Sequence, residues 1–367
     1  MNYSELRKRT RKVTLGRDGT EKIYVGGDSP VSVQSMLNVP TDDFDAVLKQ
    51  TRELEKAGAD IVRLTVPRPE NASVFSFLRE SGVRVPLVAD IHFDYKAAIE
   101  SVAAGADKIR INPGNIGSED RIKAVVSACR ENSVPIRIGV NSGSLEKNIL
   151  AKYGAPTSEA LYESAMYHVS LLRKFDFDDI VISVKSSDLR TMIGAYRMLS
   201  DAVDYPLHLG VTEAGTKRRG VMKSAVGIGS LLCDGIGDTI RVSLTADPVE
   251  EIYEGRRLLD TVGISEGGIE VVSCPTCGRT AVDLISLVNE FESRSEELNC
   301  KKRIKVAIMG CAVNGPGEAR EADFGVACGD GCGLIFEGGE IIRKVKETEI
   351  IETLLNMCVK YGSVKTC

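Results

Sequence analysis

A repeat of short apolar runs and longer helical runs dominates the chain between residues 30 and 245. The apolar runs are VSVQSML (31–37), DIVRLTV (60–66), PLVADIH (86–92), KIRINP (108–113), PIRIGVN (135–141), DIVISVKS (179–186), YPLHLGVT (205–212) and TIRVSL (239–244). Stretches such as DDFDAVLKQTRELEKAGAD (42–60) lie between them and carry apolar residues at helical spacing. Eight strand–helix units predict a (β/α)8 TIM-like barrel. A doubly wound open sheet is the alternative, but no Gly-x-Gly-x-x-Gly follows the first predicted strand.

Polar side chains recur at every second position of these strands, although parallel strands buried on both faces should be continuously apolar. The alternating positions are Arg63 and Thr65, Asp90 and His92, Arg110 and Asn112, Arg137 and Asn141, Ser183 and Lys185, His208 and Thr212, and Arg241 and Ser243. Such a series would face the barrel interior, mostly near the C-terminal ends of the strands, where barrel active sites lie.

The five cations of this series, Arg63, Arg110, Arg137, Lys185 and Arg241, face few acidic residues. Unpaired buried charge is costly, so we expect the ligand to supply the negative charge. Guanidinium groups bind phosphate oxygens through paired hydrogen bonds, which favours a diphosphate or two phosphates as the ligand.

A second unit follows the predicted barrel. Asp247 is a helix N-cap, the helix ends at Gly263, and ISEGGIE (264–270) is a linker. We therefore expect a substrate-binding barrel of residues 1–263 and a small α+β domain of residues 264–367. The latter begins with a strand (269–273), a helix (280–298) and a strand (303–310), and continues with a strand (322–328), a hairpin (333–345) and a final helix (347–360).

Eight of the ten cysteines lie after residue 270, which indicates metal or redox chemistry in the second domain. Cys274 and Cys277 follow its first strand and Cys311 follows its second. A right-handed crossover makes these strands parallel, so the three thiols would meet at one sheet edge. Structural zinc and an iron–sulfur cluster both fit such ligands. Candidate fourth ligands are Cys300, Cys328, Cys332 and Glu318.

The composition excludes several classes of protein. The formal net charge of −5 argues against non-specific nucleic-acid binding. No apolar run reaches the ~18 residues of a membrane span. The basic segment RKRTRK (7–12) has no apolar core behind it and is not a secretory signal. We expect a cytoplasmic protein that binds neither nucleic acid nor membrane.

The motifs taken together resemble the 4-hydroxy-3-methylbut-2-enyl diphosphate synthase family of the non-mevalonate isoprenoid pathway, in its bacterial two-domain form. The resemblance is carried by VQSM (33–36), PLVADIHFDY (86–95), IRINPGNIG (109–117), IRIGVNSGSLE (136–146), SVKSSD (183–188), YPLHLGVTEAG (205–215), GIGDTIRVSLT (235–245), CPTCGRT (274–280) and MGCAVNGPGEA (309–319). It runs nearly from end to end, with the motifs in the family's order.

This resemblance implies an oxidoreductase acting on CH or CH2 groups. The implied reaction is the reductive ring opening and dehydration of 2-C-methyl-D-erythritol 2,4-cyclodiphosphate, with flavodoxin or ferredoxin as electron donor. It also implies a [4Fe–4S] cluster held by Cys274, Cys277, Cys311 and Glu318. A carboxylate is a weakly held ligand, which suits a catalytic cluster.

The family reading assigns roles to the barrel residues. We expect substrate binding by Arg63, Arg110, Asn112, Arg137, Asn141, Lys185, Arg241 and Ser243. Glu213, just past the seventh strand, is the expected proton donor to the departing hydroxyl. The other expected catalytic residues, Asp90, His92 and His208, would orient the substrate hydroxyls and Glu213.

The order of elements also predicts a quaternary arrangement. The eighth strand ends at the top of the barrel, and the helix after it runs back for ~24 Å, so the second domain starts at the bottom. Because the linker is short, we expect a head-to-tail homodimer in which each cluster caps the barrel of the partner.

Two other classes of protein remain open at this point. A pterin-binding, dihydropteroate-synthase-like barrel with structural zinc would be colourless and redox-inactive. A non-enzymatic iron–sulfur sensor would be coloured but would not need the barrel arginines.

Overall fold

The computed structural model describes residues 3–17, 19–265, 267–295, 298, 300, 302–311 and 321–362. The chain divides into two compact units, Met1–Val262 and Gly263–Cys367. Each unit has its own sheet and its own hydrophobic core.

The first unit contains an eight-stranded parallel sheet with the strand order β8-β7-β6-β5-β4-β3-β10-β9. Its strands are β3 (Ser32–Met36), β4 (Ile61–Thr65), β5 (Leu87–Asp90), β6 (Lys108–Ile111), β7 (Ile136–Asn141), β8 (Ile180–Lys185), β9 (His208–Leu209) and β10 (Thr239–Ile240). A parallel bridge between Ile182 and Leu207 joins β8 to the residues before β9 and closes the circle. The predicted barrel is therefore confirmed. The last two strands are shorter than predicted, although hydrogen bonds continue beyond them, as from Arg241 N to Leu209 O.

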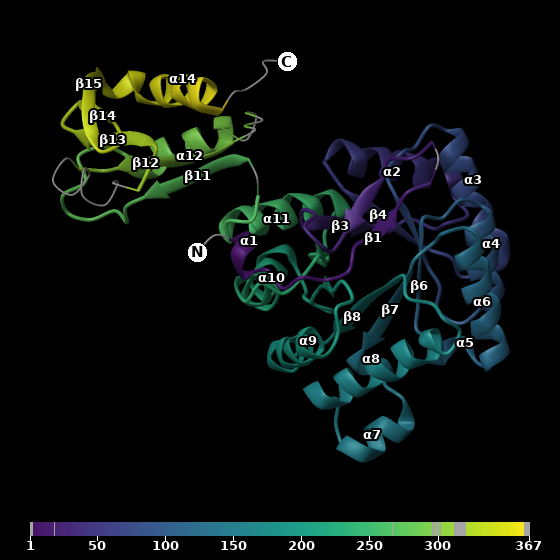
Figure 1. The fold of residues 1–367 in the computed structure, drawn as a ribbon. Coiled ribbons are helices and arrows are strands. Elements are labelled where there is room, and N and C mark those ends of the chain that lie inside the picture. Colours follow the sequence, from purple (N-terminus) through teal and green to yellow (C-terminus); the bar gives the residue numbers. More distant parts are fainter. Residues whose placement is uncertain are drawn as a thin grey trace. The chain divides into compact units, whose positions relative to one another are not determined.

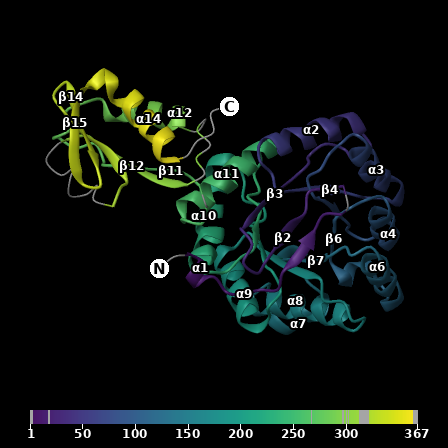
Figure 2. The same cartoon turned by 45° about the horizontal axis from the view of Figure 1, so that its top comes forward.

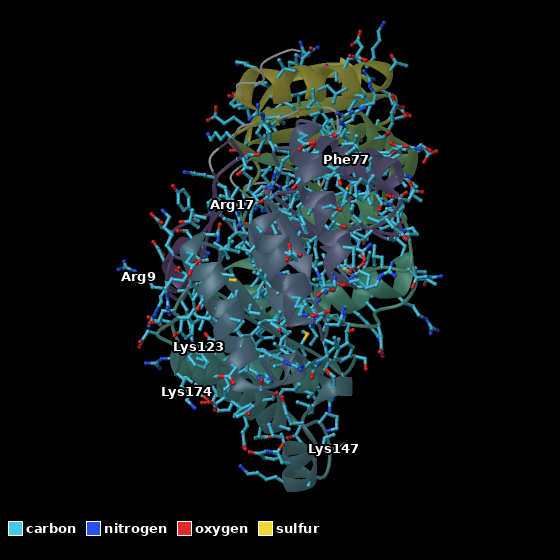
Figure 3. All side chains as sticks on the ribbon, turned by 90° about the vertical axis from the view of Figure 1, so that its right-hand side faces the viewer. Arg9, Arg17, Phe77, Lys123, Lys147 and Lys174 are labelled. Carbon is cyan, nitrogen blue, oxygen red and sulfur yellow. The ribbon has the colours of Figure 1, made fainter. Side chains whose placement is uncertain are left out.

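Helices surround this sheet (Figures 1 and 2). They are α2 (Phe44–Lys56), α3 (Ser73–Glu80), α4 (Tyr95–Ala103), α5 (Pro113–Ile116), α6 (Glu119–Glu131), α7 (Lys147–Tyr153), α8 (Ser158–Arg173), α9 (Leu189–Ala202), α10 (Lys217–Cys233) and α11 (Pro248–Thr261). Side-chain caps begin several of them, with Asp43, Asp94 and Asp188 accepting hydrogen bonds from backbone N–H groups in the first turn. The charged side chains of Lys123 and Lys174 project from this helical layer into solvent (Figure 3).

A short antiparallel hairpin of β1 (Val13–Leu15) and β2 (Ile23–Val25) precedes the barrel strands and was absent from the sequence analysis. Val13, Leu15 and Val25 of the hairpin form one buried cluster with the barrel residues Ile61, Val88 and Val181. Ile61 and Val88 lie two residues before Arg63 and Asp90, toward the N-terminal ends of β4 and β5. The hairpin thus closes the floor of the barrel with apolar side chains.

The second unit contains one five-stranded sheet with the order β11-β12-β13-β14-β15. The strands are β11 (Gly268–Ser273), β12 (Arg303–Met309), β13 (Phe324–Gly329), β14 (Cys332–Glu337) and β15 (Glu340–Lys346), and the helices are α12 (Leu284–Ser295) and α14 (Ile350–Gly362). β11, β12 and β13 are parallel, whereas β14 and β15 are antiparallel to their neighbours.

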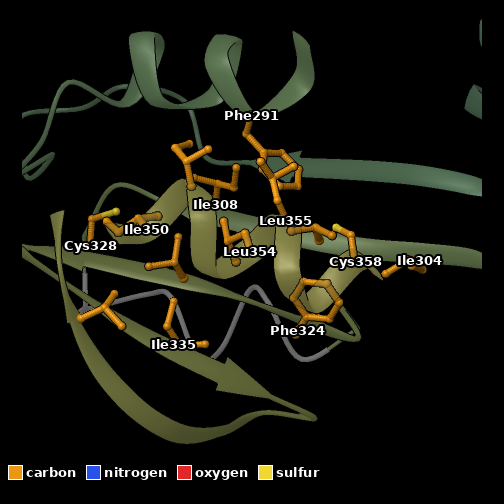
Figure 4. Packing of buried hydrophobic residues seen from close by; sticks show 14 of the residues in the cluster. Phe291, Ile304, Ile308, Phe324, Cys328, Ile335, Ile350, Leu354, Leu355 and Cys358 are labelled. Atoms are coloured by element: carbon orange, nitrogen blue, oxygen red, sulfur yellow. The ribbon is translucent and has the colours of Figure 1, made fainter. Parts of the chain in front are cut away.

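Both α-helices in the described part of the second unit pack on one face of its sheet. Phe291 of α12 and Leu354 of α14 meet Ile308, Phe324 and Ile335 of the strands in a continuous buried cluster (Figure 4). A smaller cluster on the other face contains Ala307, Met309, Ala322, Ala327 and Phe336. The strand–helix–strand start of this domain agrees with the pattern in the sequence, although α12 begins at Leu284, four residues later than predicted.

Candidate active site

The upper interior of the barrel contains a buried ion-pair group built on β4, β5 and β6. Asp90 accepts hydrogen bonds from Arg63 Nη2 at 2.6 Å and from Arg110 Nη1 at 3.1 Å. Burial alone would raise the pKa of Asp90, but the charges of Arg63 and Arg110 outweigh it and hold that pKa well below its usual range. Asp90 therefore stays ionised and fixes the two guanidinium groups.

Gly139 of β7 makes room for this group. A Cβ at this position would lie 2.2 Å from Arg110 Nε, so a larger residue would displace the guanidinium. The carbonyl oxygen of Gly139 also accepts a hydrogen bond from Arg110 Nη2 at 3.1 Å. The glycine at this position therefore serves the orientation of Arg110.

Arg137 and Lys185 differ from these arginines because they lack a carboxylate partner in the described part of the chain. Arg137 is 1% exposed and donates from Nη1 to Ser183 Oγ at 3.0 Å, while its Nε and Nη2 are buried and have no partner among the described residues. Burial, followed by repulsion from Arg241, Arg63 and Arg137, lowers the pKa of Lys185 well below its ordinary value. Both side chains are therefore available to an anionic ligand.

Arg241 is held by a carboxylate from outside the strands. Its Nε lies 3.1 Å from Glu251 Oε2 and its Nη2 lies 3.1 Å from Glu251 Oε1. Glu251 lies on α11 and also accepts a hydrogen bond from Ser35 Oγ at 2.8 Å. This side chain of α11 is a counter-ion that the sequence analysis missed, since it lies ten residues after Arg241 on a predicted outer helix.

The sequence analysis also missed Lys108 and Gln34. Lys108 is 0% exposed, and its Nζ has no hydrogen-bond partner; both amide atoms of the buried Gln34 likewise lack partners among the described residues. Burial, followed by the charge of Arg137, lowers the pKa of Lys108 well below its ordinary value. The signal was available, because the alternation through Arg110 and Asn112 extends back to Lys108.

The interior and its rim therefore carry a surplus of positive charge. Among the described residues, six cations, Arg63, Lys108, Arg110, Arg137, Lys185 and Arg241, are accompanied by two paired carboxylates, Asp90 and Glu251, so the formal surplus is 6 − 2 = 4. Such an interior is stable only if ligands, water or loss of protons compensate the charge.

His208 lies inside the barrel with no surface exposure. Its Nδ1 is 3.4 Å from Thr239 Oγ1, its Nε2 has no partner in the part of the chain that the structure describes, and its backbone carbonyl accepts a hydrogen bond from the Tyr196 hydroxyl. Burial and the surrounding cations, Arg137 first among them, lower the pKa of His208 well below 6.5. His208 is therefore a neutral hydrogen-bonding group, not a proton donor at neutral pH.

Glu213 lies on the turn after β9 and is exposed. Its φ of +53° is unusual for a residue with a side chain, and such backbone strain is concentrated at functional sites. None of the other predicted catalytic residues forms a hydrogen bond or ion pair with Glu213 in the described chain. His92 is 53% exposed at its side chain, with Nε2 3.9 Å from Asp90 Oδ2.

The remaining predicted substrate residues lie near the ends of their strands. Asn112 is buried, and its side chain accepts a hydrogen bond from Gly114 N at 3.2 Å, so it caps α5. Asn141, with its amide oriented to satisfy its neighbours, accepts from Arg110 Nη2 at 3.2 Å. Ser243 is partly exposed beyond β10. Asn141 is thus joined to the ion-pair group, whereas Asn112 primarily shapes a loop.

The second unit brings Cys274 and Cys311 to the same end of its sheet, beyond the C-terminal ends of two adjacent strands. β11 and β12 are parallel with Ser273 opposite Ile308, so Cys274 directly follows one strand and Cys311 lies two residues past the end of the other. Gly310 N donates to Cys274 Sγ at 3.3 Å. Cys277 is exposed, and hydrogen bonds from Arg279 lower its pKa. Glu318, the predicted fourth ligand, lies outside the described residues.

The other cysteines occupy different positions. Cys300 lies before β12, and its carbonyl oxygen accepts a hydrogen bond from Gly268 N at the start of β11. It therefore lies at the N-terminal ends of these strands, opposite the end that carries Cys274 and Cys311. Cys328 pairs with Gly333 and Cys332 with Gly329, which places the two thiols on opposite faces of the hairpin. Burial raises the pKa of Cys328 to about 12. Within the described ranges, no three His, Cys, Asp or Glu side chains are arranged to hold a metal ion.

No described helix combines the length and the apolar character that a membrane span requires.

Comparison with known proteins identifies the family of both units. A family model described as the GcpE TIM-barrel domain matches residues 10–256, and one described as the GcpE protein C-terminal domain matches residues 270–360. A relative from Clostridium perfringens, named 4-hydroxy-3-methylbut-2-en-1-yl diphosphate synthase (flavodoxin), is 57% identical over 96% of this chain and 98% of its own length. Relatives of the same name from Fusobacterium nucleatum and Geobacillus thermodenitrificans are 55% and 51% identical, over 91% and 95% of this chain and 94% and 91% of their own lengths.

Among solved structures, a dihydropteroate synthase from Thermus thermophilus covers 68% of this chain and 98% of its own, with a TM-score of 0.47 and 17% identity. A similar match to the Yersinia pestis enzyme has a TM-score of 0.47 and 15% identity. The family models, by contrast, cover most of each unit, and the curated relatives are more than half identical over nearly their whole length. The chain therefore belongs to the GcpE family, whose curated members among these relatives are 4-hydroxy-3-methylbut-2-en-1-yl diphosphate synthases.

Proposed function

We propose that this protein converts 2-C-methyl-D-erythritol 2,4-cyclodiphosphate to 4-hydroxy-3-methylbut-2-enyl diphosphate, with flavodoxin as electron donor. The reaction consumes two electrons and two protons, opens the ring and releases one water. The named relatives support this reaction in preference to pterin chemistry or a non-enzymatic role. The structural observation that carries it is the formal surplus of basic side chains over carboxylates among the described residues of the barrel interior, which suits a cyclic diphosphate.

The residues at the edge of the second unit fit an iron–sulfur cluster. Thiolates are the ligands that such clusters use, and Cys274 and Cys311 end adjacent parallel strands. Gly310 leaves space and directs its N–H toward Cys274 Sγ, as backbone groups do around cluster sulfur. We propose Cys274, Cys277, Cys311 and Glu318 as the ligands of a [4Fe–4S] cluster. When bound, the cluster would supply the electrons for the ring opening.

The barrel residues would bind and orient the substrate. Among the described residues, Arg137 leaves two nitrogen atoms unpaired and Lys185 has no acidic partner, so these groups gain most from contact with phosphate oxygens. Arg63 and Arg110 are already oriented by Asp90 and would present preformed donors. Asp90 thus acts as a positioning residue, whereas the sequence analysis placed it among the catalytic groups. We propose that Arg241, Asn141, Asn112 and Ser243 complete the binding site.

Glu213 would donate the proton to the departing hydroxyl. It lies on a strained, exposed turn at the C-terminal side of the barrel, where barrel enzymes carry their catalytic groups. His208 is buried among cations and would serve as a neutral hydrogen-bonding group beneath the substrate. The exposed His92 is available to a substrate hydroxyl.

The test is anaerobic purification with iron and sulfide analysis, followed by turnover of the cyclic diphosphate with reduced flavodoxin. We expect a brown protein with close to four iron atoms per chain and release of the linear diphosphate. A colourless protein that contains zinc and does not turn over the cyclic diphosphate would refute the proposal.

We also propose a head-to-tail homodimer as the active form. α11 follows β10 and packs on β3, so the first unit ends at the N-terminal side of the barrel, opposite the side that carries Glu213. The 14 residues of α11 span ~21 Å. If the cluster were to serve the barrel of its own chain, the few residues between α11 and β11 would have to cover that distance in the opposite direction. A cluster supplied by a second copy avoids this requirement.

Mixing two inactive variants tests the dimer. Cys311→Ala retains a complete barrel, and Glu213→Ala retains the three thiol ligands. Random exchange of subunits should restore about a quarter of the wild-type sites, because half of the dimers are mixed and each holds one intact pair. Absence of restored activity in a sample shown to contain mixed dimers would contradict the arrangement.

A further inference from the structure

A closed set of hydrogen bonds links the loop of Cys274 and Cys277 to the end of β12. Gly310 N donates to Cys274 Sγ at 3.3 Å, and Gly310 O accepts from Ala281 N at 2.9 Å. Both backbone groups of Gly310 are therefore used to hold the cysteine loop. The two partners of Gly310, Cys274 and Ala281, precede and follow Thr280 in the sequence. Thr280 is the last residue of the CPTCGRT motif.

Thr280 holds the second cysteine of the loop. Its hydroxyl oxygen accepts from Cys277 N at 3.1 Å, and its own N–H donates to Cys277 O at 3.0 Å. Since the hydroxyl and the backbone of one residue both bind Cys277, the position of this cysteine depends directly on Thr280.

The side chain of Thr280 also approaches Gly310 closely. A Cβ at this position would lie 2.8 Å from Thr280 Cγ2 and 3.1 Å from Leu284 Cδ2. Its φ is outside the left-handed region, so lack of space, not backbone conformation, requires glycine here. The methyl group of Thr280 lies 2.8 Å from the place that this Cβ would take, so a side chain at residue 310 would push the two segments apart and move the Gly310 N–H away from Cys274 Sγ.

We propose that Gly310 is a positioning residue that raises the reduction potential of the cluster, and that Thr280 is a positioning residue that helps to retain its iron by fixing Cys277; this inference depends on the proposed function. Each reduction adds one electron, supplied by the flavodoxin-class donor, to the unit formed by the cluster and its thiolates. An N–H group directed at a ligand sulfur stabilises the added negative charge and so raises the potential. Loss of the Gly310 hydrogen bond should therefore make the cluster harder to reduce.

The principal variant is Gly310→Ala. We expect its midpoint potential, measured by redox titration followed by electron paramagnetic resonance, to become more negative. A tenfold fall in the equilibrium constant for one-electron reduction, which is ~59 mV, is the expected size. Thr280→Val removes the hydroxyl but retains the branched shape, and we expect it to lose iron faster on exposure to a chelator. Thr280→Ser retains the hydroxyl and is the matched control with near wild-type iron retention.

A double variant tests the geometry. The nearest atom to a Cβ at residue 310 is Thr280 Cγ2, which serine lacks. Thr280→Ser should therefore recover part of the potential lost in Gly310→Ala. Wild-type potential in Gly310→Ala together with wild-type iron retention in Thr280→Val would overturn the inference, and so would a double variant no better than Gly310→Ala alone.

The wild-type protein separates failure of this inference from failure of the proposed function. If anaerobic wild-type protein holds no cluster, the proposed function is wrong. If wild-type protein holds the cluster and turns over the substrate, but the variants keep its potential and iron retention, only the roles of Gly310 and Thr280 are wrong. Thermal unfolding of each variant identifies loss of the fold, which Thr280→Ser should not cause.

Discussion

At the residue scale, the interior cations differ in how far the protein itself satisfies them. Arg63 and Arg110 share Asp90 and each leave one buried nitrogen, Nε, without a partner among the described residues, and Arg241 binds Glu251. Arg137 has no carboxylate partner there and leaves two such nitrogen atoms. A group that is already paired contributes orientation to a ligand site. A group left unpaired gains a full hydrogen bond when the ligand arrives, so Arg137 should dominate the binding of phosphate.

Arg137→Met tests this difference. We expect kcat/KM for the cyclic diphosphate to fall by about 100-fold, because each lost hydrogen bond to a charged group is worth ~1.5–3 kcal/mol. We also expect the free enzyme to become more stable, since an incompletely paired buried cation has been removed. Steady-state kinetics and urea unfolding measure the two effects. An unchanged kcat/KM would exclude Arg137 from the binding site.

The buried Lys108 should make the free energy of unfolding depend on pH. Its pKa is lowered in the folded protein, whereas in the unfolded chain it has the ordinary value near 10.5. Between the lowered pKa of the folded protein and 10.5 the unfolded chain binds more protons than the folded chain, so the stability attributable to this group rises with pH across that window. Lys108→Met should therefore be more stable than wild type at pH 7 by ~1–3 kcal/mol, with a smaller difference at pH 9.5.

Urea unfolding of both proteins at the two pH values measures this difference. The exposed Lys123 on α6 provides the matched control, because Lys123→Met removes the same charge from solvent. A difference for Lys108→Met that stays constant between pH 7 and pH 9.5 would show that Lys108 has no lowered pKa.

At the element scale, the hairpin of β1 and β2 closes the floor of the barrel. Leu15 is 0% exposed and belongs to the cluster that includes Ile61, Val88 and Val181, whereas Thr14 on the same strand is exposed. The hairpin thus separates the polar interior from solvent on the side opposite the candidate active site. We therefore expect this element to contribute to the stability of the barrel.

Leu15→Ala should lower the free energy of unfolding by ~2–5 kcal/mol, since it leaves a cavity among well-packed side chains. Thr14→Ala should change it by less than ~0.5 kcal/mol, as is usual for exposed positions. Urea unfolding of the two variants compares them directly. Equal effects would mean that the hairpin does not seal the barrel floor.

At the scale of the whole molecule, the positive interior should couple ligand binding to the stability of the protein. Inorganic diphosphate carries the anionic groups of the substrate without its carbon skeleton. At 100 times its dissociation constant, a ligand that binds only the folded state adds ~2.7 kcal/mol of stability. We expect inorganic diphosphate to raise the unfolding temperature of the wild type and to have little effect on Arg137→Met. Equal stabilisation of both proteins would place the anion elsewhere.

Much of this molecule could be predicted from local patterns. The alternation of apolar and helical runs predicts the barrel, and the period of two along its strands identifies Arg63, Arg110, Arg137 and Lys185 as interior residues. The hairpin of β1 and β2 escaped prediction because each strand has only three residues. Lys108 was not predicted as an interior residue because it is the first residue of its strand, two positions before Arg110, where the recognised alternation begins.

The sequence by itself determined the two folds, the family and the kinds of side chain that enter the barrel, because helical and strand periods are local properties of the chain. The tertiary structure alone decided how those side chains are paired. Asp90 lies between Arg63 and Arg110, Glu251 reaches Arg241 from α11, and Gly310 approaches Cys274 across 36 residues. Such contacts join residues from different elements, and the distance between them depends on packing, which no local pattern encodes.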